Sequence, residues 1–168
     1  YMRVPVYGTS FTLAVVKELL TEHNMNPADY DLKEVTEATE LRFGRNQVKF
    51  IGVNHSVPEA VAIAIKTPDG NIVYTGNYNF DQNGHDLYKT NYEQLTRIAS
   101  EKVLALLPES IAAINDINRG SIIHFEHRLN KIFMNAKGRI VISLFSTNLQ
   151  RIQQIVDIAV RYNKKIAI

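Results

Sequence analysis

A histidine and several short polar side chains follow predicted strands, at places where they could carry chemistry. Residues 54–60 (NHSVPEA) contain His55 in a turn rich in Ser and Pro, directly after an apolar segment. A histidine in such a turn is well placed to point into a cleft as a metal ligand or as an acid or base near neutral pH. Taken alone, a histidine in such a turn is more often structural or incidental.

A second polar stretch, residues 75–81 (TGNYNFD), follows the next predicted strand. A glycine and then a short polar residue, here Gly76 and Asn77, are typical of irregular backbone that presents a ligand at a strand end. The alternative is that Asn77 forms an Asx-turn and has a structural role only.

A third stretch, residues 146–151 (STNLQR), lies between a predicted strand and the start of a predicted helix. Free backbone N–H groups and the helix dipole favour a phosphate at such a place, beside Ser146, Thr147 and Asn148. Arg151 could add a charge-assisted contact. The alternative is ordinary capping of the helix by Thr147 or Asn148.

Helices and strands predicted from hydrophobic periodicity position these residues. Helices are expected over about residues 10–22, 95–100, 119–135 and 148–162. Strands are expected within residues 32–43 and over residues 47–53, 61–66, 72–75, 103–107, 139–145 and 165–168. The strands at 61–66 and 103–107 are expected to be buried, and residues 67–70 (TPDG) predict a hairpin turn.

The way in which consecutive strands are connected changes along the chain. Its first half has hairpin-linked strands, whereas residues 139–168 form a strand–helix–strand pattern with a short crossover, which predicts two parallel strands. We expect a domain boundary near residues 108–120. Both ends of the chain look interrupted, so we expect a fragment; a natural small domain that ends on a strand is the alternative.

Composition limits the class of protein. The 168 residues suffice for one domain or two small or partial ones, and 45% hydrophobic with 21% charged residues is typical of a soluble globular protein. A net charge of +2 neither indicates nor opposes nucleic-acid binding. The absence of cysteine excludes disulfides, zinc fingers and thiol nucleophiles. With no signal peptide and no apolar run of about 18 residues, we expect a cytoplasmic protein.

Five segments, in collinear order over nearly the whole chain, resemble the ribonuclease J family of the metallo-β-lactamase superfamily. They are residues 6–13 (VYGTSFTL), 55–60 (HSVPEA), 66–70 (KTPDG), 75–81 (TGNYNFD) and 146–154 (STNLQRIQQ). The resemblance implies an α/β fold: part of a metallo-β-lactamase αββα sandwich over residues 1–117, then the beginning of a β-CASP parallel α/β domain over residues 118–168.

The resemblance also implies a metal-dependent ribonuclease of RNA processing and decay, which cuts single-stranded RNA internally or from its 5′ end. Two Zn²⁺ or Mn²⁺ ions would activate a water and hold the phosphate. His55 matches a metal ligand of the family, Asn77 the position of its bridging Asp, and Glu109 the acid of the first β-CASP motif. For Glu109 the alternative is a solvated loop carboxylate. The family's His-x-His-x-Asp-His motif does not occur in these residues.

Asn77 weakens this expectation of metal binding. A carboxylate bridges two cations with two anionic oxygens, whereas a neutral amide offers one carbonyl oxygen and no charge. The second metal is therefore expected to bind poorly or not at all, as in the less active second paralogue of the family. The implied partners are RNA and either further copies of the chain or an active paralogue, with no membrane. Two other hypotheses are an inactive scaffolding subunit and a metallo-β-lactamase hydrolase acting on a thioester or lactam.

Overall fold

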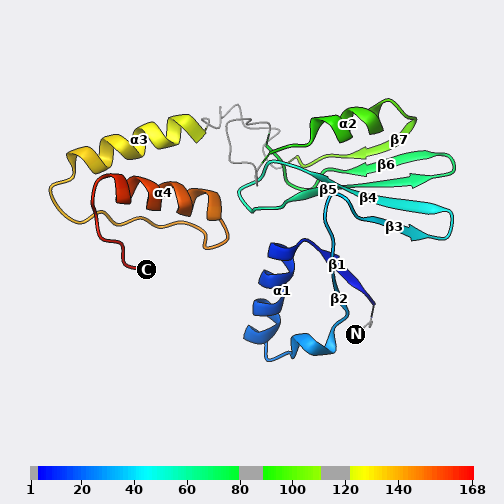
Figure 1. Cartoon of the computed structure of the whole chain (residues 1–168), viewed down its shortest axis with the longest axis horizontal. Helices are drawn as coiled ribbons and strands as arrows, with labels where there is room; N and C mark the ends of the chain where they lie inside the picture. Colours follow the sequence, from blue (N-terminus) through cyan, green and yellow to red (C-terminus); the bar gives the residue numbers. More distant parts are fainter. Residues whose placement is uncertain (1–3, 80–88, 111–121) are drawn as a thin grey trace.

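A five-stranded sheet forms the larger part of the computed structural model, which describes residues 4–79, 89–110 and 122–168. The strand order is β3-β4-β5-β6-β7 (Figure 1). Neighbouring strands are antiparallel, except that β6 and β7 are parallel. The strands are β3 (Glu40–Phe43), β4 (Asn46–Gly52), β5 (Val61–Thr67), β6 (Gly70–Tyr74) and β7 (Val103–Leu107).

The hairpin turn predicted at residues 67–70 joins β5 to β6. Thr67 pairs with Gly70, whose φ of +145° is open to glycine and strained for other residues. A Cβ at Gly70 would also lie 2.8 Å from the carbonyl oxygen of Lys102. The prediction of this turn is confirmed, and its glycine is needed both for the backbone conformation and for the close approach of β7.

A small parallel pair of strands precedes the sheet. β1 (Val6–Gly8) pairs with β2 (Leu32–Glu34), and between them lie α1 (Ser10–Glu22) and a 3₁₀ turn, η1 (Pro27–Asp29). The helix predicted for this region is confirmed. Residues 32–43, where one short strand was expected, contain two, because β2 ends before a turn and β3 then enters the main sheet.

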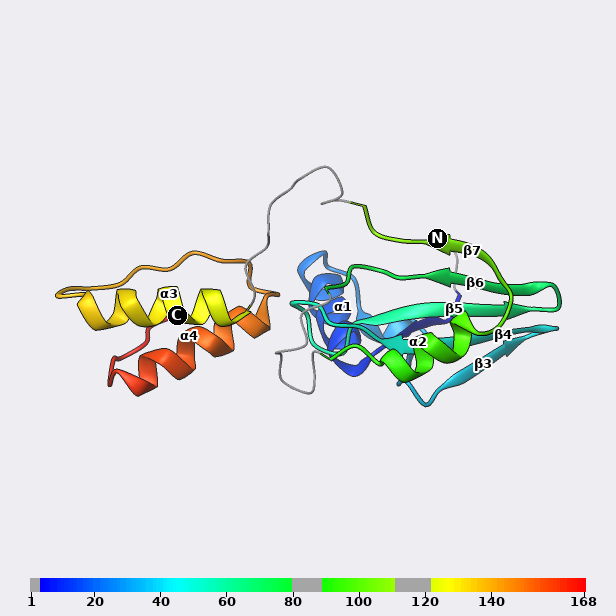
Figure 2. The ribbon, with the colours of Figure 1, turned by 90° about the horizontal axis from the view of Figure 1, so that it is seen from above.

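One face of the sheet is covered by α2 (Tyr92–Ala99), which confirms the short helix predicted there (Figure 2). Leu95 and Ile98 of α2 pack on a cluster of buried side chains from β4, β5, β6 and the residue after β4: Ile51, Val53, Ala62, Ala64 and Val73. The expectation that β5 is buried on both faces is wrong. From Val61 to Ile65 its side chains alternate between half-buried and buried, and Lys66 is exposed, because α2 covers one face only.

The expectation that the strand at residues 103–107 is buried is also wrong. β7 is the edge strand of the sheet, and every one of its residues is exposed. Leu106 is 60% exposed and Leu107 49%. In the described part of the chain, β7 pairs with β6 and no element covers either of its faces. The apolar sequence of β7 favours burial, but the described part of the chain does not bury this strand.

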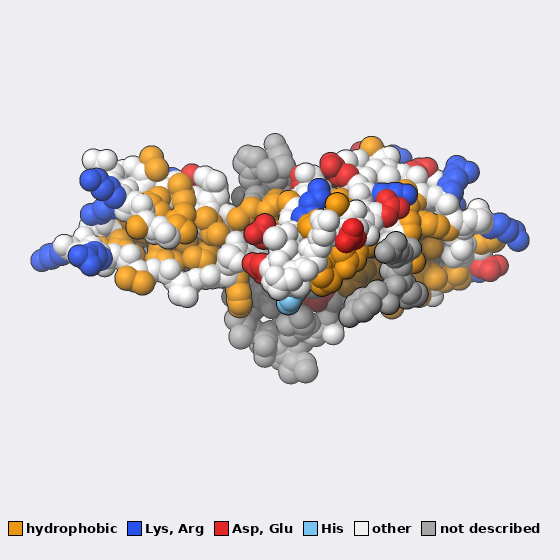
Figure 3. All heavy atoms as spheres, turned by 90° about the horizontal axis from the view of Figure 1, so that it is seen from below, with side chains coloured by type: hydrophobic (Ala, Val, Ile, Leu, Met, Phe, Trp, Pro, Cys, Tyr) orange, Lys and Arg blue, Asp and Glu red, His pale blue; other side chains and the backbone are white. Residues whose placement is uncertain are grey.

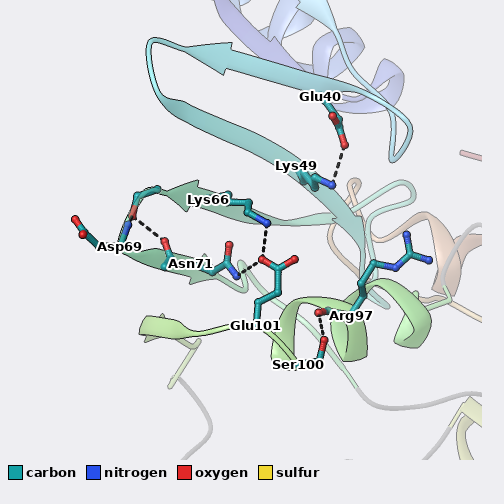
Figure 4. Close-up of polar contacts among 10 residues, drawn as sticks. Glu40, Lys49, Lys66, Asp69, Asn71, Arg97, Ser100 and Glu101 are labelled. Carbon is teal, nitrogen blue, oxygen red and sulfur yellow. Dashed lines mark hydrogen bonds and ion pairs between the residues drawn. The ribbon is translucent and has the colours of Figure 1, made fainter.

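Charged side chains connect the strands to the segment after α2 (Figure 4). Glu101 accepts hydrogen bonds from Lys66 Nζ at 2.7 Å and from Asn71 Nδ2 at 3.2 Å. The bond from Lys66, followed by that from Asn71, lowers the pKa of the Glu101 carboxyl below its ordinary value. A second pair, Lys49 with Glu40 at 2.8 Å, joins β4 to β3. These exposed contacts help to fix the register, although each contributes little stability.

Two helices form a second hydrophobic cluster. α3 (Ile122–Asn135) and α4 (Leu149–Arg161) lie side by side, apart from the sheet (Figures 1 and 2). Both confirm predicted helices. The buried side chains of the cluster are Leu129, Phe133, Ile158 and Ala159. An ion pair of 3.3 Å between Arg161 and Glu126 also links the two helices.

The two strands predicted around α4, at residues 139–145 and 165–168, are not formed. The expected parallel pair is therefore wrong for this structure, because neither segment has a pairing partner among the described residues. Val141 is 92% exposed. Between the two segments and α4 lies a largely apolar cavity of about 890 Å³, and Figure 3 shows apolar side chains gathered on this unit. The predicted domain boundary at 117/118 falls in residues 111–121, outside the described residues.

The packing of α4 can be tested with two substitutions on the same helix. Ile158 is 1% exposed and Val160 is 69% exposed. Ile158→Ala is expected to cost about 2–5 kcal/mol because it leaves a cavity between α3 and α4. Val160→Ala should change stability by about 0.5 kcal/mol or less. Urea unfolding followed by helical circular dichroism measures both, and equal effects would contradict this packing of α3 on α4.

Candidate functional site

The loops at one end of the sheet lie beside the N-terminal end of α4 (Figures 1 and 2). Residues from both line a polar pocket of about 480 Å³. Its lining residues are Asn54, His55, Ser56, Asn77, Tyr78, Asn79, Glu109, Asn148, Gln150 and Arg151. The structure thus brings five of the sequence-predicted site residues together: His55, Asn77, Glu109, Asn148 and Arg151. Ser146 and Thr147 do not line this pocket; Ser146 lies at the apolar cavity beside α4.

The loop of residues 54–60, which carries His55, is held at its first residue by two backbone hydrogen bonds. The N–H of Asn79 donates to the carbonyl oxygen of Asn54 at 2.7 Å. The N–H of Asn54 donates to Thr90 Oγ1 at 2.9 Å. Asn54 is 2% exposed, so these bonds satisfy backbone groups that water does not reach. They place His55 next to the loop that carries Asn77.

The other end of the loop is held by Glu59. Its carboxylate accepts a hydrogen bond from the N–H of Phe11, in the first turn of α1, at 3.0 Å. The residue before α1, Thr9, makes no side-chain capping bond. Glu59, 48 positions from Phe11 in the sequence, caps the helix in its place. Glu59 has a φ of +58°, an uncommon conformation for a residue with a side chain. The helix start and the His55 loop are therefore coupled.

His55 is half-buried, and its Nδ1 accepts a long hydrogen bond of 3.4 Å from the N–H of Val57. In the neutral ring this bond favours the tautomer with the proton on Nε2. Burial lowers the pKa of His55 below 6.5, and the nearby negative charge of Glu109 opposes that shift. The neutral form is thus favoured near pH 7.

Asn77 and Glu109 approach the pocket from the ends of β6 and β7. Gly76 has a φ of +59° and turns the chain so that Asn77 follows directly. Asn77 is exposed to solvent and makes no Asx-turn within the described residues. The N–H of Glu109 donates to Thr75 Oγ1 at 3.1 Å, which fixes the backbone of this acid beside the strand that leads to Asn77.

The first N–H groups of α4 are all engaged. The N–H of Leu149 donates to Thr147 at 2.9 Å, that of Gln150 to the carbonyl oxygen of Ser56 at 3.5 Å, and that of Arg151 to the side chain of Asn148 at 3.2 Å. Of the two alternatives for this stretch, capping by Asn148 is the one observed. The phosphate contact predicted for this stretch stays a prediction.

Two side chains of the first turn of α4 face different partners. The guanidinium of Arg151 lies 4.0 Å from the ring centre of Phe125 and donates to Gln154 Oε1 at 3.0 Å. The Nε2 atom of Gln150 is buried and has no hydrogen-bond partner in the described part of the chain. Gln150 was not among the predicted site residues. No pattern in the sequence singled it out.

The described residues do not fit the two-metal centre that the resemblance implies. Among them, no group of three or more His, Cys, Asp or Glu side chains could hold a metal ion. The pocket offers one imidazole, His55, and one carboxylate, Glu109; the remaining polar side chains are amides, hydroxyls and a guanidinium. The predicted ligand role of His55 stays a prediction.

Comparison with known proteins identifies the class of protein. No family model matches the chain. The chain is 32% identical over 164 residues to "Ribonuclease J 2" of Streptococcus pyogenes, which covers 98% of this chain and 30% of that protein. Its identity to "Ribonuclease J 2" of Staphylococcus epidermidis is 33% over 163 residues, covering 97% of this chain and 29% of that protein. The match is therefore to ribonucleases. The chain belongs to the ribonuclease J family and spans about 30% of the length of these relatives.

A solved structure shares the fold. It is a protein of unknown function from Enterococcus faecalis, with a TM-score of 0.70 and 19% sequence identity. The superposition covers 92% of this chain and 39% of that chain. The likeness supports the arrangement of α/β elements described above and concerns the fold alone.

The capping role of Glu59 can be tested by removing its oxygens. Glu59→Ala is expected to lower stability by about 1 kcal/mol, because the first turn of α1 loses an acceptor. Glu59→Gln keeps an acceptor oxygen and should retain most of that stability. Thermal unfolding measures both variants. Equal losses would show that the charge of Glu59, not its hydrogen bond to Phe11, holds the loop.

The environment of His55 predicts a specific pH dependence. Because folding lowers the pKa of His55, its contribution to stability is present above pH 6.5 and is lost as the pH falls through the folded-state pKa. Glu109→Gln removes the charge that opposes this shift, so the pKa of His55 should fall further. Titration of the imidazole by NMR measures it. A rise of the pKa in the variant would contradict the assigned contact between the two side chains.

Proposed function

We propose that the chain is part of an RNA-processing protein of the ribonuclease J type, which binds single-stranded RNA in the pocket and hydrolyses its phosphodiesters slowly. One observation carries this proposal: residues from the sheet loops and from α4, which the family resemblance selected independently, line one pocket. The curated relatives are named as ribonucleases. We place this activity in the cytoplasm. No helix in the described residues is both long and apolar enough to span a membrane.

In this proposal residues 1–117 belong to a metallo-β-lactamase domain and residues 118–168 begin a β-CASP domain. The separate hydrophobic clusters of the sheet and of α3 with α4 support such a division. The RNA strand would then lie between the two domains. The pocket, which takes residues from both, is where part of that strand would bind.

We expect slow hydrolysis because Asn77 replaces the carboxylate that would bridge the two metal ions. The family would use two Zn²⁺ or Mn²⁺ ions, which supply an activated water and charge stabilisation. The side chains of this chain instead position RNA: Arg151 brings positive charge, Glu109 brings a carboxylate, and His55 is held mainly neutral. With Asn77 at the bridging position, two dications would lack the negative charge that offsets their repulsion.

The second candidate is a catalytically weak or inactive subunit that scaffolds an active ribonuclease J paralogue, or that assembles with further copies of itself. The specific observation in its favour is Asn77, a neutral amide that lines the pocket at the position where the family has its bridging carboxylate. Measurement of RNA turnover separates the two candidates, because a scaffold binds RNA or its partner without cleaving.

The test restores the bridging carboxylate. In the protein expressed from its whole coding sequence, Asn77→Asp is expected to raise bound Mn²⁺ or Zn²⁺ and to accelerate cleavage of single-stranded RNA by about tenfold or more, in line with the effect of metal-site groups. Asn79→Asp, which adds the same charge to the same pocket two residues away, is the matched control.

Metal content by plasma mass spectrometry and RNA cleavage by gel assay measure the outcome. If the parent protein already holds two metals and turns over RNA quickly, the proposal that the metal site is degenerate is wrong. A variant that gains metal but no activity would favour the scaffolding subunit.

A further inference from the structure

The carboxamide of Gln150 is the polar group of the pocket that the proposed phosphate chemistry leaves unused. Its Nε2 atom is buried and unpaired among the described residues, although Gln150 lines the polar pocket. Buried donors in native proteins nearly always have a partner, because an unmade hydrogen bond costs free energy. An unpaired donor beside a pocket therefore points to a ligand that brings an acceptor atom.

The backbone of Gln150 is fixed, so the donor cannot easily move to another partner. Gln150 lies in the first turn of α4, with its own N–H directed at the carbonyl oxygen of Ser56 at 3.5 Å. The next residue, Arg151, is held against the ring of Phe125 at 4.0 Å. The helix start is thus attached both to the loop of residues 54–60 and to α3.

A second carboxamide lines the pocket from the sheet side. Asn77 is exposed and makes no hydrogen bond within the described residues. Each carboxamide offers a donor and an acceptor on one planar group. The edge of a nucleobase presents the same combination, and asparagine and glutamine are common readers of base edges. A phosphate presents acceptors alone.

The charges of the pocket also favour a neutral group over an anion. The positive charge of Arg151 is accompanied by the negative charge of Glu109. The backbone N–H groups at the start of α4, which would otherwise attract a phosphate, already have acceptors. A phosphate in this pocket would meet a carboxylate and no free backbone donor at the helix end.

We propose that this pocket holds one nucleobase of single-stranded RNA, with Gln150 Nε2 donating a hydrogen bond to an acceptor atom on the edge of the base. The inference rests on the proposed RNA-binding function and names the part of RNA that occupies the site. Asn77 lies at the same pocket and presents its amide to the bound base. A position used for a bridging carboxylate in the family then serves as a reader of bases.

The experiment measures binding of three single-stranded oligomers of equal length and charge to the 168-residue chain in the presence of EDTA. They are oligouridylate, oligoadenylate and an abasic ribose-phosphate oligomer. Fluorescence anisotropy measures the affinity for each. We expect the chain to bind at least one base-bearing oligomer about fivefold or more tightly than the abasic one, the factor of one neutral hydrogen bond.

Gln150→Leu keeps the approximate size of the side chain and removes the donor. It should weaken binding of the preferred base-bearing oligomer about fivefold and leave the abasic oligomer unaffected. Because the free protein loses an unpaired buried donor, its unfolding temperature should stay the same or rise by about 2–4 °C. Gln153→Leu, on the same helix but exposed and bonded to Asp157, is the matched control and should leave binding unchanged.

The outcomes separate the two proposals. If the abasic oligomer binds as tightly as the others, or if Gln150→Leu weakens it equally, the pocket takes the phosphate backbone and the base proposal is wrong, while RNA binding stands. If Gln150→Leu lowers the unfolding temperature and leaves all affinities unchanged, Gln150 has a structural role and the proposal is again wrong. If no oligomer binds, RNA binding itself fails.

Discussion

The pocket depends on how the backbone of one irregular loop, residues 54–60, is satisfied. Such a loop cannot pair its N–H and C=O groups as a strand does, so other parts of the chain must supply partners. Here Asn79 and Thr90 hold its first residue, the first turn of α1 holds Glu59, and the start of α4 meets Ser56. Four segments therefore converge on the loop, and two of them, residues 77–79 and the start of α4, carry side chains that line the pocket.

This convergence explains why the site is polar without being rich in charge. Much of its polar surface comes from side chains at the ends of strands and at a helix cap, where amides are favoured for reasons of backbone geometry. Asn148 caps α4, and Asn54 lies at a bridge between two loops. In a family whose relatives are named as ribonucleases, a metal centre would need carboxylates and imidazoles at these places. Amides there favour hydrogen bonding to a neutral ligand.

Local features of the fold could be predicted from sequence, whereas features that depend on neighbours could not. The turn at residues 67–70 and the helix capped by Asn148 follow from the conformational preferences of a few adjacent residues, and both were predicted. The exposure of β7 and the absence of strands at residues 139–145 and 165–168 depend on which elements cover or pair with them. Apolar sequence indicates that a segment prefers burial but does not name its partner. For the site, the positions of His55 and Asn77 after predicted strands were visible in the sequence. Gln150 was not singled out, because the lack of a hydrogen-bond partner for its Nε2 atom is visible in three dimensions only.

The division of the pocket between the sheet and α4 has a consequence for binding. A ligand that touches both Asn77 and Gln150 gains its full contact only while the α3–α4 unit is docked on the loop of residues 54–60. The direct backbone contact across this junction, from Gln150 to Ser56, is 3.5 Å long and therefore weak. A bound nucleotide would add hydrogen bonds on both sides of the junction. It would stabilise the docked arrangement by the difference between its binding free energies for the docked and the undocked arrangement. Changes that loosen the packing of α4, even at Ile158 on its buried face, should then weaken RNA binding without touching the ligand.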